Sequence, residues 1–281
     1  MNHKRLNVSL VIPAYNEERQ LARCLNQISR QTVAPDEVIV VDNNSSDATA
    51  AIASKYPFVK LIKESKQGIV FARNAGYNAA RGEIIGRIDV DTLLPANWVA
   101  HLQEFYADSQ HPNSAWVGPN LFYNVRFPKI LCWAMWPIGF GINRLLIHTN
   151  TLWGSNMALL KSQWESVKAT TCTDNSIHED LDLAIHLYKE QNVKTYFDRQ
   201  MVVWATFHPL DFRTRETWDY LQRWPRTLRK HHNPGWLVAE LIGVGLIYCL
   251  IPPNMFIEWV ARQFGKPLAY DAEQTARKPD Q

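Results

Sequence analysis

Apolar and polar residues alternate along the first part of the chain in blocks that predict strands and helices in turn. Residues 8–12 form a short apolar run typical of a buried strand, and residues 17–29 carry Leu21, Leu25 and Ile28 at helical spacing. The alternation continues to about residue 125, with strands expected at 38–41, 58–62 and before Asp89, and helices at 46–55 and 69–80. This order predicts an α/β fold with a mostly parallel sheet flanked by helices.

Polar segments follow three of these strands, at Ala14–Glu17, Asp42–Asp47 and Asp89–Asp91. Ligands of parallel α/β sheets collect outside the carboxyl ends of the strands. We therefore expect the three segments to face one crevice.

Asp89-Val90-Asp91 closes an apolar run and carries the clearest chemical signal. Two carboxylates at positions i and i+2 project to the same side of a strand end. Such a pair suits Mg²⁺ or Mn²⁺, and the cation can in turn hold the phosphates of a nucleotide. The alternative is that the two acids are solvated side chains in a turn. The neighbouring motifs have to distinguish a metal site from such a turn.

Composition sets broad limits on the class of protein. The chain has 281 residues, 46% hydrophobic and 20% charged, with a net charge of +3, which is enough for one large core and does not indicate a nucleic-acid partner. Its four cysteines lie far apart without C-x-x-C spacing, and the N-terminus leads into a strand without the apolar stretch of a signal peptide. These features predict reduced thiols, a cytoplasmic location and no zinc site.

The first strand is followed by neither G-x-G-x-x-G nor a P-loop, which argues against dehydrogenases and P-loop enzymes. Residues 13–17 instead read Pro-Ala-Tyr-Asn-Glu, and residues 42–47 read Asp-Asn-Asn-Ser-Ser-Asp. With Asp89-Val90-Asp91 and the later acidic segment 178–182 in the same order, the chain resembles family 2 glycosyltransferases of the GT-A fold from about residue 8 to residue 208. The resemblance implies a GT-A domain over residues 1–210 and a basic, amphipathic helical extension over residues 211–281.

The resemblance also implies a donor site. It assigns the nucleoside to Pro13, Ala14, Tyr15, Glu17 and Asp42, the donor phosphate or sugar to Arg73, and the ribose or a metal-bound water to Asp89. Asp91 is implied as the direct metal ligand, with His208 as a second one. Asn43 departs from the family, since many relatives have a second Asp there. The alternatives are helix capping by Ser46 or Asp47, a surface ion pair for Arg73 and a structural role for His208.

A second set of residues concerns the acceptor. His178-Glu179-Asp180-Leu181-Asp182 resembles the family's acidic motif at a helix start, so Asp180 is implied as the base that deprotonates the acceptor hydroxyl. The helix dipole favours a carboxylate there, and we expect it to be ionised near neutral pH, although acids at helix starts also occur for stability alone. Further residues are expected to bind the acceptor or to position the base: Glu179, Asp182, Ser155, Asn156, Arg223 and Trp224.

Arg223 and Trp224 resemble the end of the Q-x-x-R-W signature of processive members, but Tyr220 replaces the Gln, which argues against polymer synthesis. The alternative is an amphipathic helix with Trp218, Leu221, Trp224 and Leu228 facing inward. Residues 213–232 hold six Lys or Arg against two acids, and the stretch 241–257 is free of charge. Seventeen residues fall short of the roughly 20 that span a bilayer, so we expect attachment to the cytoplasmic membrane surface, with a core helix as the alternative.

The sequence therefore predicts a Mn²⁺- or Mg²⁺-dependent, inverting glycosyltransferase. It would move a sugar from a nucleoside diphosphate sugar to a hydroxyl of a glycan or lipid-linked acceptor. One alternative is a membrane-associated sugar-nucleotide-binding scaffold without turnover. Another is a sugar-phosphate nucleotidyltransferase, which would require a Gly-rich, basic loop where residues 13–17 have neither Gly nor a base.

Overall fold

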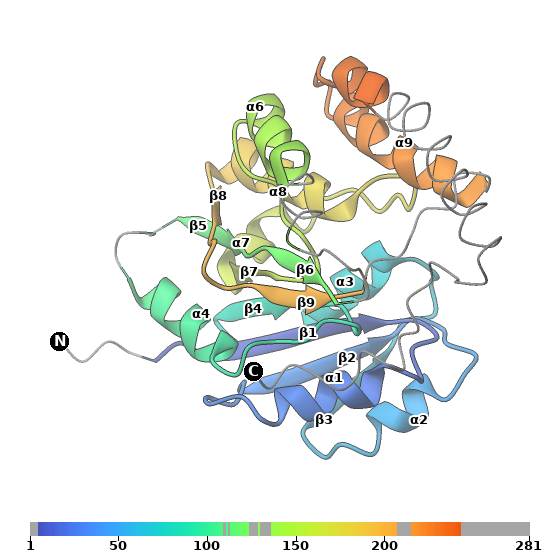
Figure 1. Ribbon diagram of the computed structural model, residues 1–281, viewed down its shortest axis with the longest axis vertical. Helices are drawn as coiled ribbons and strands as arrows, with labels where there is room; N and C mark the ends of the chain where they lie inside the picture. The colour runs from blue at the N-terminus through green and yellow to red at the C-terminus, as the bar shows by residue number, and fades with distance from the viewer. Residues whose placement is uncertain are drawn as a thin grey trace, which may run out of the picture.

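A seven-stranded sheet forms the centre of the molecule in the order β3-β2-β1-β4-β7-β5-β8 (Figure 1). The computed structural model describes residues 5–108, 111, 113–123, 129, 136–206 and 215–242. Strands β1 to β4 pair in parallel, whereas β7 runs antiparallel to both β4 and β5. The predicted α/β fold with a mostly parallel sheet is therefore confirmed. The strands of this sheet are β1 (Val8–Ala14), β2 (Glu37–Asp42), β3 (Val59–Lys63), β4 (Ile84–Arg87), β5 (Ser114–Val117), β7 (Met157–Leu160) and β8 (Lys194–Phe197).

Helices cover both faces of the sheet, and a small second sheet lies beside it (Figure 1). The second sheet pairs β6 (Asn120–Phe122) with β9 (Val203–Ala205) in parallel. The helices are α1 (Leu21–Ile28), α2 (Thr49–Ala53), α3 (Ile69–Ala79), α4 (Trp98–Ala107), η1 (Pro137–Ile142), α6 (Asn143–Ile147), α7 (Lys161–Val167), α8 (Glu179–Gln191) and α9 (Arg215–Lys230). Residues 236–242 form a further helical segment.

The period-two alternation of strand side chains divides the core into two layers. Leu10 and Ile12 on β1 pack with residues of α1 and α4, while Val11 between them packs with residues of α3, α7 and α8. Since both faces are covered by helices, the central strands are apolar on both sides, which is why they read as continuous apolar runs.

The order of the strands reverses beside β1. From β1 the chain moves outward through β2 and β3, and then returns to β4 on the other side of β1. Open α/β sheets bind ligands at such a reversal, outside the carboxyl ends of the strands. The segments after β1 and β4, which contain Glu17 and Asp91, therefore lie at this edge.

Helix α9 and the residues after it pack against the main body. Leu228 and Ala239 are fully buried in the same core layer as Leu181 and Ile185 of α8. The alternative of an amphipathic helix had Trp218 facing inward, but 47% of its surface is exposed, so that part of the alternative does not hold. Nowhere in residues 5–108, 111, 113–123, 129, 136–206 and 215–242 does a helix combine the length and apolarity needed to cross a bilayer. His208 and the stretch 243–257 lie outside the described residues.

Candidate active site at the carboxyl edge of the sheet

Arg87, the last residue of β4, joins three carboxylates at the edge of the sheet. Its guanidinium donates to Asp180 Oδ1 at 2.6 Å and Glu179 Oε1 at 3.1 Å, and lies 3.4 Å from Asp89 Oδ1. The side chain is only 3% exposed. Arg87 was not predicted from the sequence. The available signal was an Arg at the end of an apolar strand, two positions before Asp89 and four before Asp91, so that its side chain points to the same side.

Asp180 lies between Arg87 and the turn before β7. Its Oδ1 accepts from Arg87, and its Oδ2 accepts from the backbone N–H of Gly154 at 2.7 Å. Burial raises the pKa of Asp180 to about 7, with help from the carboxylates of Glu179 and Asp89 and against the effect of Arg87. The raised pKa runs against the expected ionisation near neutral pH, because burial outweighs the helix dipole.

Glu179 and Arg73 hold the start of α8 in place. Arg73 is fully buried, and it donates to the backbone carbonyl of Glu179 at 2.6 Å and to Asn74 Oδ1 at 2.9 Å. Despite burial, the guanidinium groups of Arg87 and Arg73 lower the pKa of Glu179. Burial excludes the surface ion pair considered for Arg73, and its present contacts are with protein groups. A donor-binding role for Arg73 stays a prediction.

The turn after β1 is tied to the loop after β2. Asn16 adopts a left-handed conformation with φ 55°, and its Oδ1 accepts from the N–H of Ser46 at 2.9 Å. The N–H of Glu17 donates to Thr49 Oγ1 at 2.7 Å. Asp47 accepts from the N–H of Thr49 at 2.9 Å, so the capping interpretation holds for Asp47. The two loops therefore form one surface on which Tyr15 is half exposed.

Asp42 and Asn43 end β2 with different roles. Asp42 is buried and accepts from the N–H of Ser45 at 3.2 Å. Asn43 donates to the carbonyls of Glu64 and Lys66 and accepts from the N–H of Gly68. A carboxylate has no donors, so Asn43 supports the 64–68 loop in a way that an Asp at this position could not.

Asp89 and Asp91 lie just beyond β4, which ends at Arg87 and not at Asp89 as predicted. The Asp89 side chain is 42% exposed, and Asp91 Oδ2 accepts from the N–H of Thr206 at 3.1 Å. Partial burial raises the pKa of Asp89, and the charge of Asp91 raises it further against the effect of Arg87. A divalent cation would relieve this repulsion between two oxygen-bearing side chains, so the pair fits the metal that was expected.

The turn Gly154-Ser155-Asn156 connects the two halves of the site. A Cβ on Gly154 would meet the guanidinium carbon of Arg87 at 2.3 Å, so only glycine allows this approach. Asn156 is fully buried, donates to the carbonyls of Pro119 and Met201, and accepts from Trp98 Nε1. Ser155 accepts from the side chain of Asn120. Both side chains are thus engaged with protein groups, and an acceptor role for either stays a prediction.

Helix α9 lies beside the start of α8 and carries Arg223 and Trp224, two of the residues expected to bind the acceptor. Thr227 Oγ1 accepts from the N–H of His178, and the ring of Tyr220 meets that of His178 edge to face at 5.2 Å. Arg223 lies 5.8 Å from the Tyr220 ring centroid, and Trp224 Nε1 donates to Asn143 at 2.8 Å. Asp182 is fully buried with other partners, so its contacts do not favour acceptor binding.

The sheet order and the helices on both of its faces define an α/β fold of the GT-A class, with an acidic pair beyond β4 and Asp180 of α8 at its carboxyl edge. Mannosyltransferase PcManGT from Pyrobaculum calidifontis, solved in complex with GDP-Man and Mn²⁺, has a similar fold, with a TM-score of 0.59 and 20% identity over 97% of this chain and 80% of that one. TarS residues 1–349 of S. aureus, solved in complex with UDP-GlcNAc, give a TM-score of 0.58 and 18% identity over 79% of this chain and 66% of that one.

The family follows from the sequence comparison. The family model described as glycosyl transferase family 2 matches residues 9–163, and the chain belongs to that family. Glycosyltransferase AglE of Haloferax volcanii is 36% identical over 99 residues. The aligned stretch covers 33% of this chain and 33% of AglE, so the similarity concerns a third of that relative's length.

Proposed function

We propose that the protein is a metal-dependent, inverting glycosyltransferase that moves a sugar from a nucleoside diphosphate sugar to an acceptor hydroxyl. The observation that carries the proposal is the Arg87 cluster, which brings Asp89 at the donor edge and Asp180 on α8 to one guanidinium. Inverting transfer by direct displacement requires a leaving-group site and one base on opposite sides of the reacting carbon. The cluster supports such an arrangement.

The donor side would consist of the β1 and β2 loops and the acidic pair. Half-exposed Tyr15 offers an aromatic face to a base, and Asp42 and Glu17 offer carboxylates to the nucleoside hydroxyls. Asp91 and Asp89 would hold Mn²⁺ or Mg²⁺, with His208 as a further candidate ligand. When bound, the cation supplies Lewis-acid stabilisation to the departing diphosphate.

The acceptor side would depend on Asp180. The pKa of about 7 places Asp180 close to the value at which a general base works best. Arg87 and the N–H of Gly154 fix its two oxygens and thereby orient it. Glu179 neutralises part of the Arg87 charge. The guanidinium therefore stabilises the ionised form of Asp180 less than it would alone, and Asp180 stays basic enough to accept a proton.

Asp180→Asn tests the base role. We expect the variant to bind nucleotide sugar with unchanged affinity but to lose transfer by about 10²–10⁴-fold, because the amide cannot take a proton. Isothermal calorimetry with a panel of nucleotide sugars, with and without Mn²⁺, measures binding, and product formation measures transfer. Undiminished transfer would remove Asp180 from this role, and no metal-dependent binding of any donor by the wild-type chain would contradict the assignment as a whole.

A scaffold without turnover is the competing function. Donor hydrolysis in Mn²⁺ by the wild-type chain, which Asp180→Asn or Asp91→Asn lowers, separates the two because a scaffold would hydrolyse nothing. Nucleotidyltransferase activity has no support in the described site, since residues 13–17 after β1 offer no glycine or basic residue to a triphosphate.

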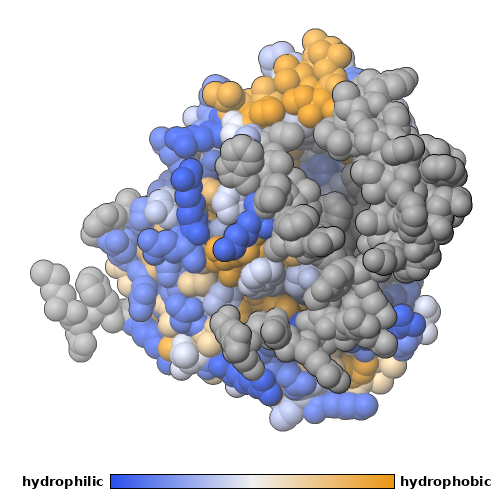
Figure 2. Space-filling model, in the orientation of Figure 1, coloured by the Kyte–Doolittle hydropathy of each residue, from blue (hydrophilic) through white to orange (hydrophobic). Residues whose placement is uncertain are grey.

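Peripheral membrane contact at the cytoplasmic face, with a lipid-linked or cell-surface glycan as acceptor, is part of the proposal. Figure 2 shows apolar residues gathered at the top of the molecule, and the exposed ones on α6 and the 236–242 segment are Leu145, Leu237, Val238 and Leu241. Arg229 and Lys230 flank them with exposed side chains that also form ion pairs with Glu240 and Asp174. Exposed basic side chains beside apolar ones are typical of interfacial helices.

Sedimentation with vesicles measures this contact. We expect the wild-type chain to sediment with anionic vesicles and the double variant Leu237→Ser, Leu241→Ser to stay in solution. Phe58→Ser, which removes an exposed aromatic residue elsewhere, serves as the control. Equal sedimentation of all three chains would contradict the contact.

A further inference from the structure

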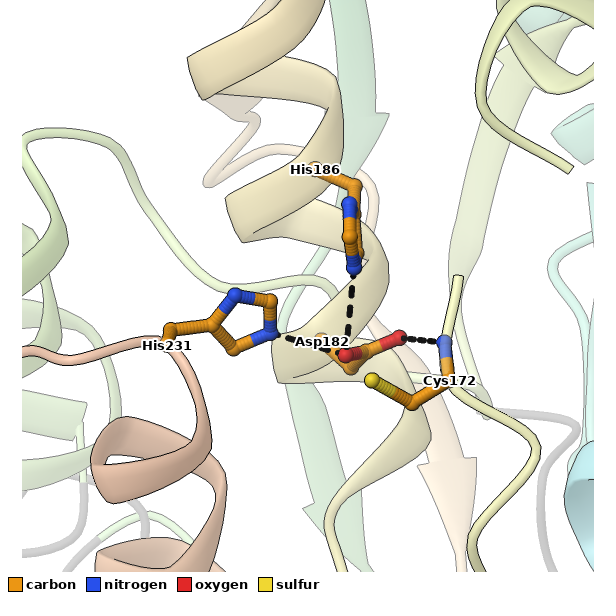
Figure 3. A group of neighbouring side chains, drawn as sticks. All are labelled: Cys172, Asp182, His186 and His231. Atoms are coloured by element: carbon orange, nitrogen blue, oxygen red, sulfur yellow. Dashed lines mark hydrogen bonds and ion pairs between the residues drawn. The ribbon is translucent and has the colours of Figure 1, made fainter. Parts of the chain in front are cut away.

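Four side chains with metal-binding atoms converge on α8, away from the Arg87 cluster (Figure 3). Asp182 and His186 lie one helical turn apart on α8, Cys172 lies in the loop before it, and His231 directly follows α9. One donor atom from each lies within 4.8 Å of the others. Asp180 and Asp182 are about 200° apart around the helix, which is why they belong to different clusters.

Asp182 lies at the centre of the group and is fully buried. Its Oδ1 is 2.8 Å from His231 Nε2 and 3.5 Å from His186 Nε2, and its Oδ2 accepts from the N–H of Cys172 at 3.0 Å. The imidazole rings of His186 and His231 meet edge to face with centroids 4.8 Å apart. Two imidazoles, a thiol and a carboxylate therefore share one small volume.

A carboxylate behind the ring orients the imidazole of His186, as is common for metal-binding histidines. Its Nδ1 lies 2.5 Å from Glu190 Oε1, and Glu190 is held in turn by the hydroxyl of Thr170 at 2.9 Å. With a metal ion bound, this contact would hold the proton on Nδ1 and leave the Nε2 lone pair, which lies on the side of Asp182, for the ion. That Nε2 atom is buried and has no hydrogen-bond partner. A carboxylate behind a histidine commonly fixes the tautomer of metal-binding imidazoles.

We propose that Cys172, Asp182, His186 and His231 bind one Zn²⁺ ion, at a site separate from Asp89 and Asp91. Zinc takes tetrahedral sets of sulfur, imidazole nitrogen and carboxylate oxygen, whereas Mg²⁺ and Mn²⁺ prefer oxygen alone. Donor atoms of a tetrahedral zinc site stand roughly 3–4 Å apart, so small side-chain shifts bring the four donors into range.

The site is structural and not catalytic, because all four ligands come from the protein and leave no open position. It joins the end of α9, through His231, to α8 and to the loop before it. Helix α9 carries Tyr220 and Arg223 beside the start of α8, so bound zinc would fix the wall of the acceptor side. The site stands independently of the proposed function, since its test measures metal and not transfer.

The test uses the full reduced chain, loaded with Zn²⁺, passed through gel filtration and analysed by mass spectrometry for metal. We expect about one zinc per chain, as a closed four-ligand site holds. Replacement by Co²⁺ should give a thiolate-to-cobalt charge-transfer band in the near ultraviolet. Cys172→Ser should abolish the band, and His231→Gln should lose the retained zinc.

Matched variants separate this site from other sources of metal. His232→Asn changes the exposed neighbour of His231, Cys24→Ala removes another thiol, and Asp91→Asn removes the donor-site ligand; all three should keep the zinc and the cobalt band. Glu190→Gln, which leaves the four ligands intact, should weaken zinc affinity about 10-fold or more. If the variants at the four ligands fail to fold, the cobalt band of the wild-type chain and the zinc affinity of Glu190→Gln still test whether the site binds zinc. Zinc lost from the wild-type chain, no cobalt band, or a band that Cys172→Ser retains would overturn the proposal.

Discussion

Arg87 is the residue on which the candidate active site depends most, because one guanidinium contacts the carboxylates of Asp89, Glu179 and Asp180. The planar fork reaches separate carboxylates at once, which a single ammonium group cannot do. Its effect is therefore both structural and chemical: it holds α8 against β4 and it sets the charge around Asp180.

Arg87→Leu should lower the free energy of unfolding by about 3–5 kcal/mol, since it leaves buried carboxylates without a partner. Arg87→Lys keeps the charge and should recover part of the stability but little of the transfer activity. Denaturant unfolding measured alongside transfer tests both expectations. Stability unchanged in Arg87→Leu would show that water or relaxation compensates for the lost pairs.

Gly154→Ala should impair the site through Arg87. The added methyl would lie 2.3 Å from the guanidinium carbon, so the side chain must move away from Asp180. We expect a stability loss of about 1–3 kcal/mol and a clear loss of transfer. Gly141→Ala is the control, because nothing lies within 4 Å of a Cβ there. Wild-type transfer by Gly154→Ala would mean that the position of Arg87 is not critical.

At the scale of elements, an ion pair joins α4 to the segment after β8. His101 Nε2 lies 2.5 Å from Asp198 Oδ2, and Trp116 also donates to that carboxylate at 3.2 Å. The hydrogen bond to Asp198 raises the pKa of His101, while hydrogen bonds from His101, Gln200 and Trp116 lower the pKa of Asp198 despite its burial.

The pair should make stability depend on pH. A raised histidine pKa contributes stability that is present below the unfolded value of about 6.5 and is lost as pH rises through the folded value. A lowered aspartate pKa contributes stability above about 3.9 that is lost as pH falls. The difference in free energy of unfolding between the wild-type chain and His101→Gln should thus be largest between about pH 4 and 6.5 and shrink at higher pH. His148→Asn, at an exposed site, should show no such profile.

At the scale of the whole molecule, residues 215–242 belong to the body of the protein. Leu228 and Ala239 are fully buried in the core layer that holds Leu181 and Ile185. The predicted division at residue 210 stays a prediction about domains, but this packing implies that removal of residues 215–242 would destabilise the core. Burial of one leucine alone stabilises by about 1.5–3 kcal/mol.

A chain that ends at residue 210 should therefore unfold at a Tm roughly 5 °C or more below that of a chain that ends at residue 242. Thermal unfolding of both chains, followed by circular dichroism, makes the comparison. Equal Tm values would show that residues 215–242 add nothing to the core and would favour an independent C-terminal unit.

The sequence by itself determined the elements of the first part of the chain, through β4, and the sheet edge at which their loops meet. Apolar runs and helical spacing set the strands around Val11, Val40 and Ile85, since burial on both faces of a parallel sheet requires apolar residues at every position. Motif order and strand ends then located the segments at Glu17, Asp42 and Asp89, because the carboxyl ends of parallel strands share one edge.

Only the tertiary structure decided the partners of these residues. Arg87 meets Glu179 and Asp180 across more than 90 positions of sequence, Asn43 binds the 64–68 loop, and burial raises the pKa of Asp180 against the helix dipole. The sequence predicted no zinc site because its cysteines lack C-x-x-C spacing, yet folding assembles Cys172, Asp182, His186 and His231 from three separate segments. Contacts between distant segments depend on how helices pack on the sheet, and the periodicity of one segment carries no information about its neighbour across the core.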